Sequence, residues 1–340
     1  MSPERFQIIT DKYPQLRIAV VGDFCLDRYL EIDPALAESS IETGLPVHNV
    51  VNVRAQPGAA GTILNNLAAL GIGRIEPVGF CGDDGEGYEL RRALANKPGV
   101  RLDHFHQTDQ RRTFTYCKPL VIENGRPPKE LNRLDSKNWT PTPALLQGRL
   151  VDSAANAAGE ADAMIIMDQV DIPETGVVTS KLLEALPHIA GELPQLFILA
   201  DSRRGLRGFN GTSLKMNGAE LMSLTDGNAG LDLDEVIRLA RELSRRQHHK
   251  VFVTLAERGI VGATPAGDVE HVTALPVQGP IDIVGAGDAV TANLAAAVAG
   301  GASLREALEM ANTAASIVIH QLGTTGTASV AQMRGLLFPS

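Results

Sequence analysis

The chain contains 340 residues, of which 44% are hydrophobic and 33 are glycine, and it carries a formal net charge of −9. This length is enough to bury a sizeable core, and the glycine content suits an α/β protein with many tight turns. The negative charge disfavours nucleic acid and anionic membranes as partners, because binding to either requires a basic face.

The three cysteines, Cys25, Cys81 and Cys117, lie far apart and form no Cys-x-x-Cys pair. This scattered set argues against a disulfide framework and against a structural zinc site. The amino terminus lacks the apolar segment of a secretory signal, and no apolar run approaches the ~20 residues of a membrane span. We therefore expect a soluble, cytoplasmic protein.

The first predicted strand covers residues 16–22, which are mostly apolar and include several β-branched side chains. Asp23 and Asp27 follow its carboxyl end. In open α/β sheets, ligands bind outside the carboxyl ends of the strands. These carboxylates are therefore placed to accept hydrogen bonds from substrate hydroxyls. The alternative interpretation is a turn former and a surface charge.

A second strand is predicted at residues 46–53, followed by a loop of small residues that runs into a helix ending at Gly71. Gly58 and Ala59 lie in this loop, and small residues let a ligand approach the backbone closely. A tightly packed helix start is the alternative interpretation.

Residues 111–118 alternate between apolar and polar, which predicts a strand, and Asn124-Gly125 indicates a hairpin turn. Together with residues 30–53, these strands interrupt a series of βαβ units. We interpret them as a small β lid that excludes water during a reaction, with an ordinary surface flap as the alternative. Arg112 and Lys118 are candidates for binding a substrate phosphate, although either could simply lie on a solvated strand face.

Two further core strands are predicted to end at Asp168 and Asp201. The second strand is followed by three arginines, which could face either a phosphate group or solvent. They are Arg203, Arg204 and Arg207.

Asn217 and Glu220 follow the next strand with Asn-x-x-Glu spacing. In its simplest interpretation this is a helix-capping arrangement. The same oxygens also suit Mg²⁺, which keeps several waters and takes few protein ligands. Residues 250–254 predict another strand, and Glu257 and Gly259 lie in the turn after it.

The segment Asp282-Ile-Val-Gly-Ala-Gly-Asp288 predicts a short strand, a glycine turn and an alanine-rich helix that ends at Gly300. Small residues before a helix leave its first N–H groups unshielded, and these groups favour an anion. A carboxylate beside such a site suits proton abstraction from a hydroxyl while the N–H groups hold a transferring phosphoryl group. In the alternative interpretation, Asp288 only complements the helix dipole.

The last long helix is predicted to open with a capping box at Ser303-Leu-Arg-Glu306 and to run past Asn312. We find no internal repeat and no low-complexity tract. A dinucleotide-binding oxidoreductase would need Gly-x-Gly-x-x-Gly after the first strand, and residues 22–27 do not provide it.

The segment 282–288 resembles the signature of the ribokinase-like (PfkB) carbohydrate kinases, usually Asp-Thr-x-Gly-Ala-Gly-Asp, with Ile283 in place of threonine. Further motifs of this family occur in family order over essentially the whole chain. They are Gly-Asp-x-x-x-Asp at 22–27, Asn-x-x-Glu at 217–220, and Thr-x-Gly-x-x-Gly at 254–259, where Ala256 replaces the first glycine.

Within this family, the chain resembles the heptose 7-phosphate kinases most closely. Their Pro-Gly-Gly-Ala-Ala-Asn segment corresponds to residues 57–62, with Ala59 for the second glycine and Thr62 for the asparagine. Their Tyr-Gly-Lys-Gly segment is missing, because Val170-Asp-Ile-Pro stands at that place.

The resemblance implies an ATP- and Mg²⁺-dependent kinase that transfers the γ-phosphoryl group to a hydroxyl of a sugar or sugar phosphate, possibly heptose 7-phosphate. Asp288 would be the catalytic base, and Gly285, Ala286 and Gly287 the anion hole. The predicted substrate-binding residues are Asp23, Asp27, Gly58, Ala59, Asn65, Asn66 and Lys118. The predicted nucleotide-binding residues are Asn217, Thr254, Glu257, Gly259 and Asn312. The predicted metal-binding residues are Asn217 and Glu220.

The expected fold is a ribokinase-like three-layer α/β/α sandwich with a small β-sheet lid. The core would comprise residues 1–29, 54–105 and 138–340, and the lid residues 30–53 and 106–137, with a homodimer forming through the lid. The alternatives are a family kinase of fructose, ribose or nucleoside type, or a non-catalytic sensor of sugars or nucleotides. Asp288 argues against a sensor, which has no need of a catalytic base.

Overall fold

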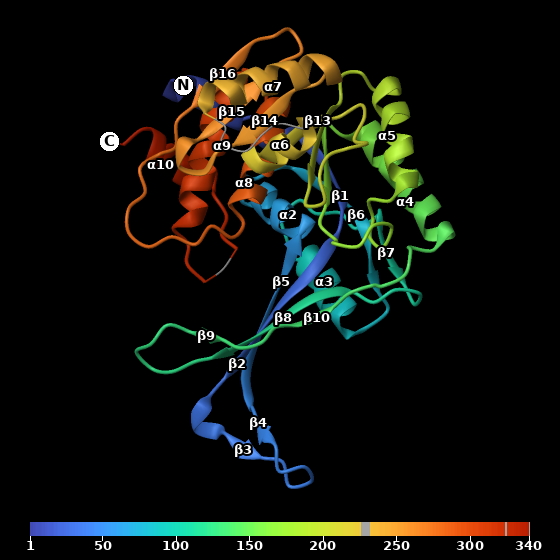
Figure 1. Cartoon of the computed structure of the whole chain (residues 1–340), viewed down its shortest axis with the longest axis vertical. Coiled ribbons are helices and arrows are strands. Elements are labelled where there is room, and N and C mark those ends of the chain that lie inside the picture. Colours follow the sequence, from blue (N-terminus) through green and yellow to red (C-terminus); the bar gives the residue numbers. More distant parts are fainter. Residues whose placement is uncertain (226–231, 324, 340) are drawn as a thin grey trace.

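The computed structural model describes residues 1–225, 232–323 and 325–339. Figure 1 shows a large α/β body from which a narrow arm of β-strands extends. Within the described residues, no helix is both long enough and apolar enough to cross a membrane.

The body is built on a sheet whose strands, among the described residues, follow the order β16-β15-β14-β13-β12-β11-β1-β6-β7. Neighbouring strands are parallel, except that β15 runs antiparallel to both β14 and β16. The bounds are β1 Arg17–Gly22, β6 Arg74–Gly82, β7 Phe105–Thr108, β11 Ala163–Asp168, β12 Phe197–Ser202, β13 Ser213–Asn217, β14 Val251–Thr254, β15 Ile260–Ala263 and β16 Val269–Val272.

Both faces of this sheet are buried, which explains why its strands are almost continuously apolar. Along β1, Ile18 and Val20 pack into one core while Ala19 and Val21 pack into the other. The helices contributing to the first core are α1 Pro3–Thr10, α2 Ala60–Ala69, α3 Gly85–Ala95, α8 Ala286–Ala299, α9 Leu304–Ile319 and α10 Val330–Leu337. Those contributing to the second are α4 Ala144–Glu160, α5 Ser180–Glu192, α6 Gly218–Thr225 and α7 Leu233–Gln247. The predicted α/β/α sandwich is therefore confirmed.

A second sheet forms the arm, with strands in the order β10-β8-β2-β5 and with β9 paired to β8. The chain passes from the body into this sheet through Asp23, because β1 ends at Gly22 and β2 begins at Phe24. The bounds are β2 Phe24–Ile32, β5 Val50–Ala59, β8 Phe114–Val121, β9 Lys129–Glu130 and β10 Leu134–Ser136, and a separate pair is formed by β3 Glu38–Ser39 and β4 Pro46–Val47. Short 3-10 turns lie at η1 Tyr13–Gln15, η2 Pro34–Leu36 and η3 Ala256–Arg258.

The capping box at Ser303 and Glu306 is confirmed, since both reciprocal hydrogen bonds are present at the start of α9. The short strand expected before α8 was wrong. Ile283 and Val284 are exposed and irregular, and Asp282 Oδ1 accepts a hydrogen bond from Val284 N at 3.0 Å. Two apolar residues are too few to define a strand when an aspartate can form a local turn instead.

The two alanines that replace family glycines keep a backbone conformation typical of glycine. Ala59 has φ 55° and ψ −120°, and Ala256 has φ 50°. A side chain with a Cβ rarely adopts such angles, because the Cβ comes too close to the backbone. These two turns therefore hold alanine in a conformation that glycine adopts at lower cost.

We expect Ala59→Gly to raise the free energy of unfolding by roughly 0.5–1 kcal/mol, because relief of backbone strain exceeds the entropy that glycine adds to the unfolded chain. Urea unfolding monitored by circular dichroism measures this change. The control is Ala68→Gly inside α2, which should lower stability by about 0.5–1 kcal/mol. Equal destabilisation by both substitutions would contradict the assignment of strain to Ala59.

Candidate active site

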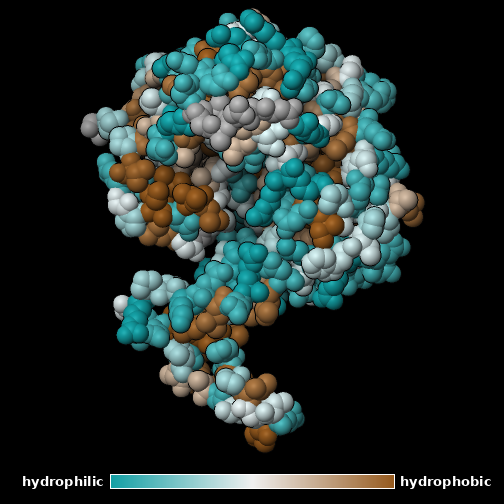
Figure 2. Space-filling view, viewed as in Figure 1, coloured by the Kyte–Doolittle hydropathy of each residue, from teal (hydrophilic) through white to brown (hydrophobic). Residues whose placement is uncertain are grey.

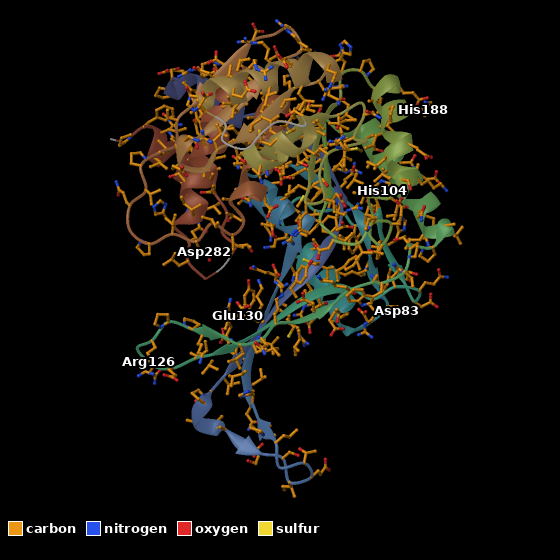
Figure 3. All side chains as sticks on the ribbon, in the orientation of Figure 1. Asp83, His104, Arg126, Glu130, His188 and Asp282 are labelled. Carbon is orange, nitrogen blue, oxygen red and sulfur yellow. The ribbon has the colours of Figure 1, made fainter. Side chains whose placement is uncertain are left out.

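The amino terminus of α8 is open to a ligand. Gly285 caps the helix with φ 84° and has no side chain to accept hydrogen bonds from the first turn. Ala286 N donates to Ile283 O at 3.2 Å. Asp288 lies in this first turn and keeps part of its surface accessible. The loop that leads into α8, marked by Asp282, lies on the side of the body that faces the arm (Figure 3). An exposed helix start of this kind favours an anionic group.

The pKa of Asp288 is raised to about 7, mainly because its surroundings remove it from water. The nearby carboxylates of Asp201 and Asp27 raise it further, and the ammonium group of Lys215 acts in the opposite direction. A general base is most effective when its pKa lies near the working pH. The environment of Asp288 therefore suits proton abstraction near neutrality.

Asp27 lies on β2, where the arm joins the body, and its side chain is buried. Lys118 Nζ on β8 lies 3.6 Å from Asp27 Oδ1 and 5.0 Å from the centre of the Tyr29 ring. Burial raises the pKa of Asp27, whereas Lys118 and Arg133 lower it. The structure thus brings together Asp27 and Lys118, two of the residues predicted to bind substrate.

Gly58, another predicted substrate residue, pairs with Cys25 on β2 and lies against the Asp27 side chain. A Cβ on Gly58 would lie only 2.5 Å from Asp27 Oδ2. Glycine is therefore required here so that the Asp27 carboxylate can occupy this space. Ala59 follows directly as the N-cap of α2.

Asp23, which was also predicted to bind substrate, is hydrogen-bonded to the protein backbone. Its carboxylate accepts hydrogen bonds from three backbone N–H groups at 2.7–3.1 Å, those of Gln169, Val170 and Val177. Burial raises the pKa of Asp23 to about 6, and Asp168 contributes to this shift. The carboxylate therefore holds the loop that follows β11.

The two predicted asparagines are also buried among protein atoms. Asn65 Nδ2 donates to Pro57 O at 3.1 Å, and Asn66 Nδ2 donates to Thr62 O at 3.0 Å. The amide of Asn65 thus fixes the small-residue segment beside Asp27, and Asn66 bonds within its own helix.

The predicted nucleotide residues lie at the carboxyl ends of β13 and β14 and in the segments next to them. Asn217 pairs in register with Thr254 across these strands. Gly259, with φ 90°, closes the turn after β14, and Glu257 in that turn is exposed. Asn312 on α9 donates to Thr273 O at 2.7 Å, beyond the end of β16.

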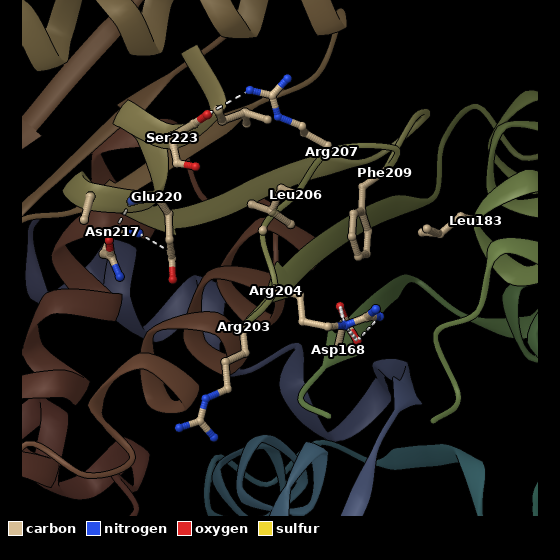
Figure 4. A pocket seen from close by; sticks show the side chains of 13 residues that line it. Asp168, Leu183, Arg203, Arg204, Leu206, Arg207, Phe209, Asn217, Glu220 and Ser223 are labelled. Carbon is tan, nitrogen blue, oxygen red and sulfur yellow. Dashed lines mark hydrogen bonds and ion pairs between the residues drawn. The ribbon is translucent and has the colours of Figure 1, made fainter. Parts of the chain in front are cut away.

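Asn217 and Glu220 cap each other. Glu220 Oε2 accepts from Asn217 N at 2.7 Å, and Asn217 Oδ1 accepts from Glu220 N at 2.9 Å. Both residues line a cavity of about 460 Å³, shown in Figure 4, whose other lining residues include Arg203 and Arg204. Because Asn217 Oδ1 and Glu220 Oε2 already accept from backbone, a metal would be contacted by the other oxygen of Glu220 or through a water.

The three arginines that follow β12 make different contacts at this cavity. Arg204 forms a two-pronged ion pair with Asp168, with Nη2–Oδ1 at 2.7 Å and Nε–Oδ2 at 3.1 Å (Figure 4). Arg207 Nη2 donates to Ser223 O at 3.0 Å. Arg203 is largely exposed, with its Nε 3.8 Å from Asp171. Arg203 and Arg207 are both exposed, whereas Arg204 is partly buried.

Comparison with known proteins was consistent with this geometry. Residues 210–331 match the family of pfkB carbohydrate kinases, and the matched region includes Asn217, Glu220 and Asp288. Over this region the chain is similar to the pfkB carbohydrate kinases.

Among the similar proteins, the bifunctional protein HldE of Azorhizobium caulinodans is 31% identical over 308 residues, which cover 90% of this chain and 61% of that protein. HldE of Gluconobacter oxydans is 28% identical over 328 residues, covering 94% of this chain and 64% of that protein. This chain thus spans less than two thirds of the length of either relative. Ribokinase of Arabidopsis thaliana, solved with ribose and ATP, has a TM-score of 0.69 at 19% identity, covering 96% of this chain and 99% of that one. This likeness confirms the ribokinase-like fold.

Sequence reasoning missed a buried polar cluster beside the Gly285–Asp288 turn. Lys215 Nζ donates to Asp201 Oδ2 at 2.8 Å, and Thr291 Oγ1 donates to the same oxygen at 2.9 Å. The available signal was a single lysine between the apolar residues Leu214 and Met216 of β13. A charged residue at a buried strand position is informative because it is rarely there without a partner.

Proposed function

We propose that this protein transfers the γ-phosphoryl group of ATP to a hydroxyl of a sugar or sugar phosphate. The observation that carries the proposal is the position of Asp288, in the first turn of a helix whose glycine N-cap leaves the start of the helix open. Asp27 lies close enough to raise the pKa of Asp288. The two carboxylates can therefore contact one acceptor, with Asp288 acting on the reacting hydroxyl and Asp27 binding other hydroxyls.

In the reaction, the acceptor oxygen attacks the γ-phosphorus while the bond from that phosphorus to the bridging oxygen of ADP breaks. The hydroxyl proton moves to the carboxylate of Asp288. The backbone N–H groups at the start of α8, around Gly285, Ala286 and Gly287, stabilise the charge on the transferring group. We further propose that the arm, which includes residues 30–53 and 114–136, covers the acceptor and excludes water, which would otherwise accept the phosphoryl group.

We infer that the acceptor already carries a phosphate group, and heptose 7-phosphate is the first candidate because the relatives are HldE proteins. The arm offers cations beside Asp27 that suit a phosphate. Lys118 lies over the Tyr29 ring, and Arg133 lies 4.9 Å from the centre of the Tyr116 ring. Both cations act on Asp27, whose pKa they lower, and their contacts with the aromatic rings help to hold them there.

A coupled assay of ADP release tests the proposal. The acceptors are ribose, fructose, fructose 6-phosphate, sedoheptulose 7-phosphate and D-glycero-β-D-manno-heptose 7-phosphate. ATP-dependent phosphorylation of at least one acceptor is expected, with higher kcat/KM for the phosphorylated sugars. No turnover of any acceptor, despite measurable ATP binding, would refute the kinase assignment and favour a sensor.

We also propose that Mg²⁺ accompanies ATP and is held through water by Glu220 and Asn217. Within the described residues, no three His, Cys, Asp or Glu side chains gather as a metal site. A site with few protein ligands, such as Glu220 and Asn217, suits Mg²⁺, which retains waters and takes most of its other ligands from phosphate oxygens.

Glu220→Gln is expected to raise the Mg²⁺ concentration that gives half the maximal rate by roughly tenfold, because the variant loses the charge that holds the metal through its bound water. Glutamine can still accept the hydrogen bond from Asn217 N, so the cap is preserved. The measurement is initial rate against Mg²⁺ at fixed ATP. Glu184→Gln, an exposed change on α5, serves as the control, and an identical Mg²⁺ dependence in all three proteins would refute this role of Glu220.

A homodimer through the arm is expected because the arm exposes apolar side chains along an unpaired strand edge. Val51 and Val53 on β5 are 54% and 44% exposed, and Figure 2 shows apolar surface on the arm. Natural proteins normally cover such edges. Sedimentation at micromolar concentration should give twice the chain mass of 36.2 kDa. Val51→Lys combined with Val53→Lys should give the monomer, and a monomeric wild type would contradict the proposal.

A further inference from the structure

Lys215 is a charged side chain buried in the centre of the body. It lies on β13 between Leu214 and Met216, which both pack into the core on one face of the sheet. Lys215 takes the opposite side and is only 7% exposed. Its Nζ reaches the amino terminus of α8, since a Cβ on Gly287 would lie 3.1 Å from it. The ammonium group is therefore directly beside the turn that holds Asp288.

The ion pair between Lys215 and Asp201 does not by itself explain why a lysine is buried here. Removing two charges from water carries a large desolvation cost, and apolar side chains of similar volume usually stabilise a core at least as well. Burial lowers the pKa of Lys215, but the charges of Asp201, Asp288 and Glu220 outweigh it and raise the pKa above its ordinary value. Lys215 thus carries a positive charge throughout the neutral range.

The hydrogen bonds of Lys215 leave capacity for a ligand. An ammonium group has three N–H donors. Among the described residues, its hydrogen-bond partner is Asp201, at 2.8 Å. Thr291 Oγ1 lies 2.9 Å from the same Asp201 oxygen and 3.1 Å from Gly287 O and shares its one hydroxyl proton between them, so Asp201 is linked to the first turn of α8. The cluster fixes the ammonium group against the glycine turn without using all its donors.

We propose that Lys215 is a further catalytic residue, whose ammonium group donates to the transferring phosphoryl group from beneath the Gly285–Asp288 turn. This inference rests on the kinase function proposed above. The backbone N–H groups supply partial charges, whereas Lys215 supplies a full positive charge fixed in a site of low dielectric. Such preorganised charge stabilises the transition state without a reorganisation cost during the reaction. Asp201 acts as the positioning residue, because it holds Lys215 and, through Thr291, the helix turn.

The test compares Lys215→Met with wild type, using the acceptor that gives the highest kcat/KM in the panel above. Methionine keeps the length of the side chain and removes its charge. Loss of one donor to the developing charge should lower kcat by about 10²–10³-fold, with a much smaller change in the KM for ATP. The acid limb of the kcat profile should also move to higher pH, because Lys215 lowers the pKa of Asp288. Because this charge effect on Asp288 is present whether or not Lys215 contacts phosphate, the fall in kcat measured above the acid limb is the result that separates a catalytic lysine from a structural one.

Two variants separate catalysis from folding. Asp201→Asn keeps the ammonium group and an oxygen that can accept from it, so kcat should fall by less than about tenfold. Asp201→Asn combined with Lys215→Met removes both charges and leaves no buried carboxylate unpaired. This double variant should fold, as judged by circular dichroism, and should show the same large loss of kcat as Lys215→Met.

An active wild type together with a double variant whose kcat lies within about threefold of it would overturn the role of Lys215 alone. A loss in Asp201→Asn as large as that in Lys215→Met would also overturn it, because the ion pair rather than the ammonium group would then matter. A wild type that phosphorylates no acceptor would instead refute the proposed function, and this inference with it.

Discussion

Asp288→Asn is expected to lower kcat by about 10²–10⁴-fold, the usual consequence of removing a general base. Asparagine keeps the shape of the side chain and removes its ability to take a proton. ATP affinity should change little or improve, because a negative charge beside the phosphate site is lost. The measurements are kcat with the best acceptor, ATP binding by calorimetry and folding by circular dichroism.

The pH dependence provides a second test of Asp288. With its pKa raised to about 7, wild-type kcat should fall below that pH as the carboxylate becomes protonated. The Asp288→Asn variant should lack this acid limb. Absence of a limb near neutrality in the wild type would contradict the assignment of Asp288 as base.

Asp288→Asn should not destabilise the folded protein, so a loss of kcat can be assigned to the missing base. An unfolded aspartate ionises near 3.8, whereas Asp288 in the folded protein ionises near 7. Between these values the folded state binds a proton that the unfolded state lacks, so ionisation of Asp288 destabilises the fold as pH rises. The neutral asparagine should therefore be at least as stable at pH 7. Asp152→Asn, an exposed change on α4, controls for loss of charge. A folded, ATP-binding Asp288→Asn variant with wild-type kcat would leave Asp288 as a helix-dipole partner only.

Features formed by residues close together in the sequence could be predicted, whereas contacts between distant segments could not. Gly285 and Asp288 are neighbours, so the glycine turn and helix start were visible in seven residues. The fold was also predictable, because buried parallel strands are read as apolar runs. The short strand before α8 failed because Asp282 forms a local turn with Val284.

Contacts between distant segments were not predictable in the same way. Asp23 stands beside Asp27 in the sequence pattern, yet its carboxylate binds backbone about 146 to 154 residues away. Lys215 reaches Gly287 only because β13 and α8 pack together in the folded body. Ala59 and Ala256 show a third case, since their positive φ angles are a property of the turn and are hidden by the alanine side chain.

The second large effect is expected at Asp27. Asp27→Asn should lower kcat/KM for the acceptor by about 10²-fold, mainly through KM, because hydrogen bonds to a charged group contribute roughly 1.5–3 kcal/mol each. Asparagine retains one accepting oxygen but loses the charge that two adjacent hydroxyls would share. The change is measured from initial rates over a range of acceptor concentrations.

The same substitution should also alter Asp288. Since the Asp27 carboxylate raises the pKa of Asp288, its loss should move the acid limb of the kcat profile to lower pH. Asp152→Asn, an exposed change on α4 in the body, removes a charge outside the proposed site and should change neither quantity. If Asp27→Asn left both KM and the acid limb at their wild-type values, Asp27 would neither bind the acceptor nor act on the base. The acceptor would then have to lie elsewhere on the arm.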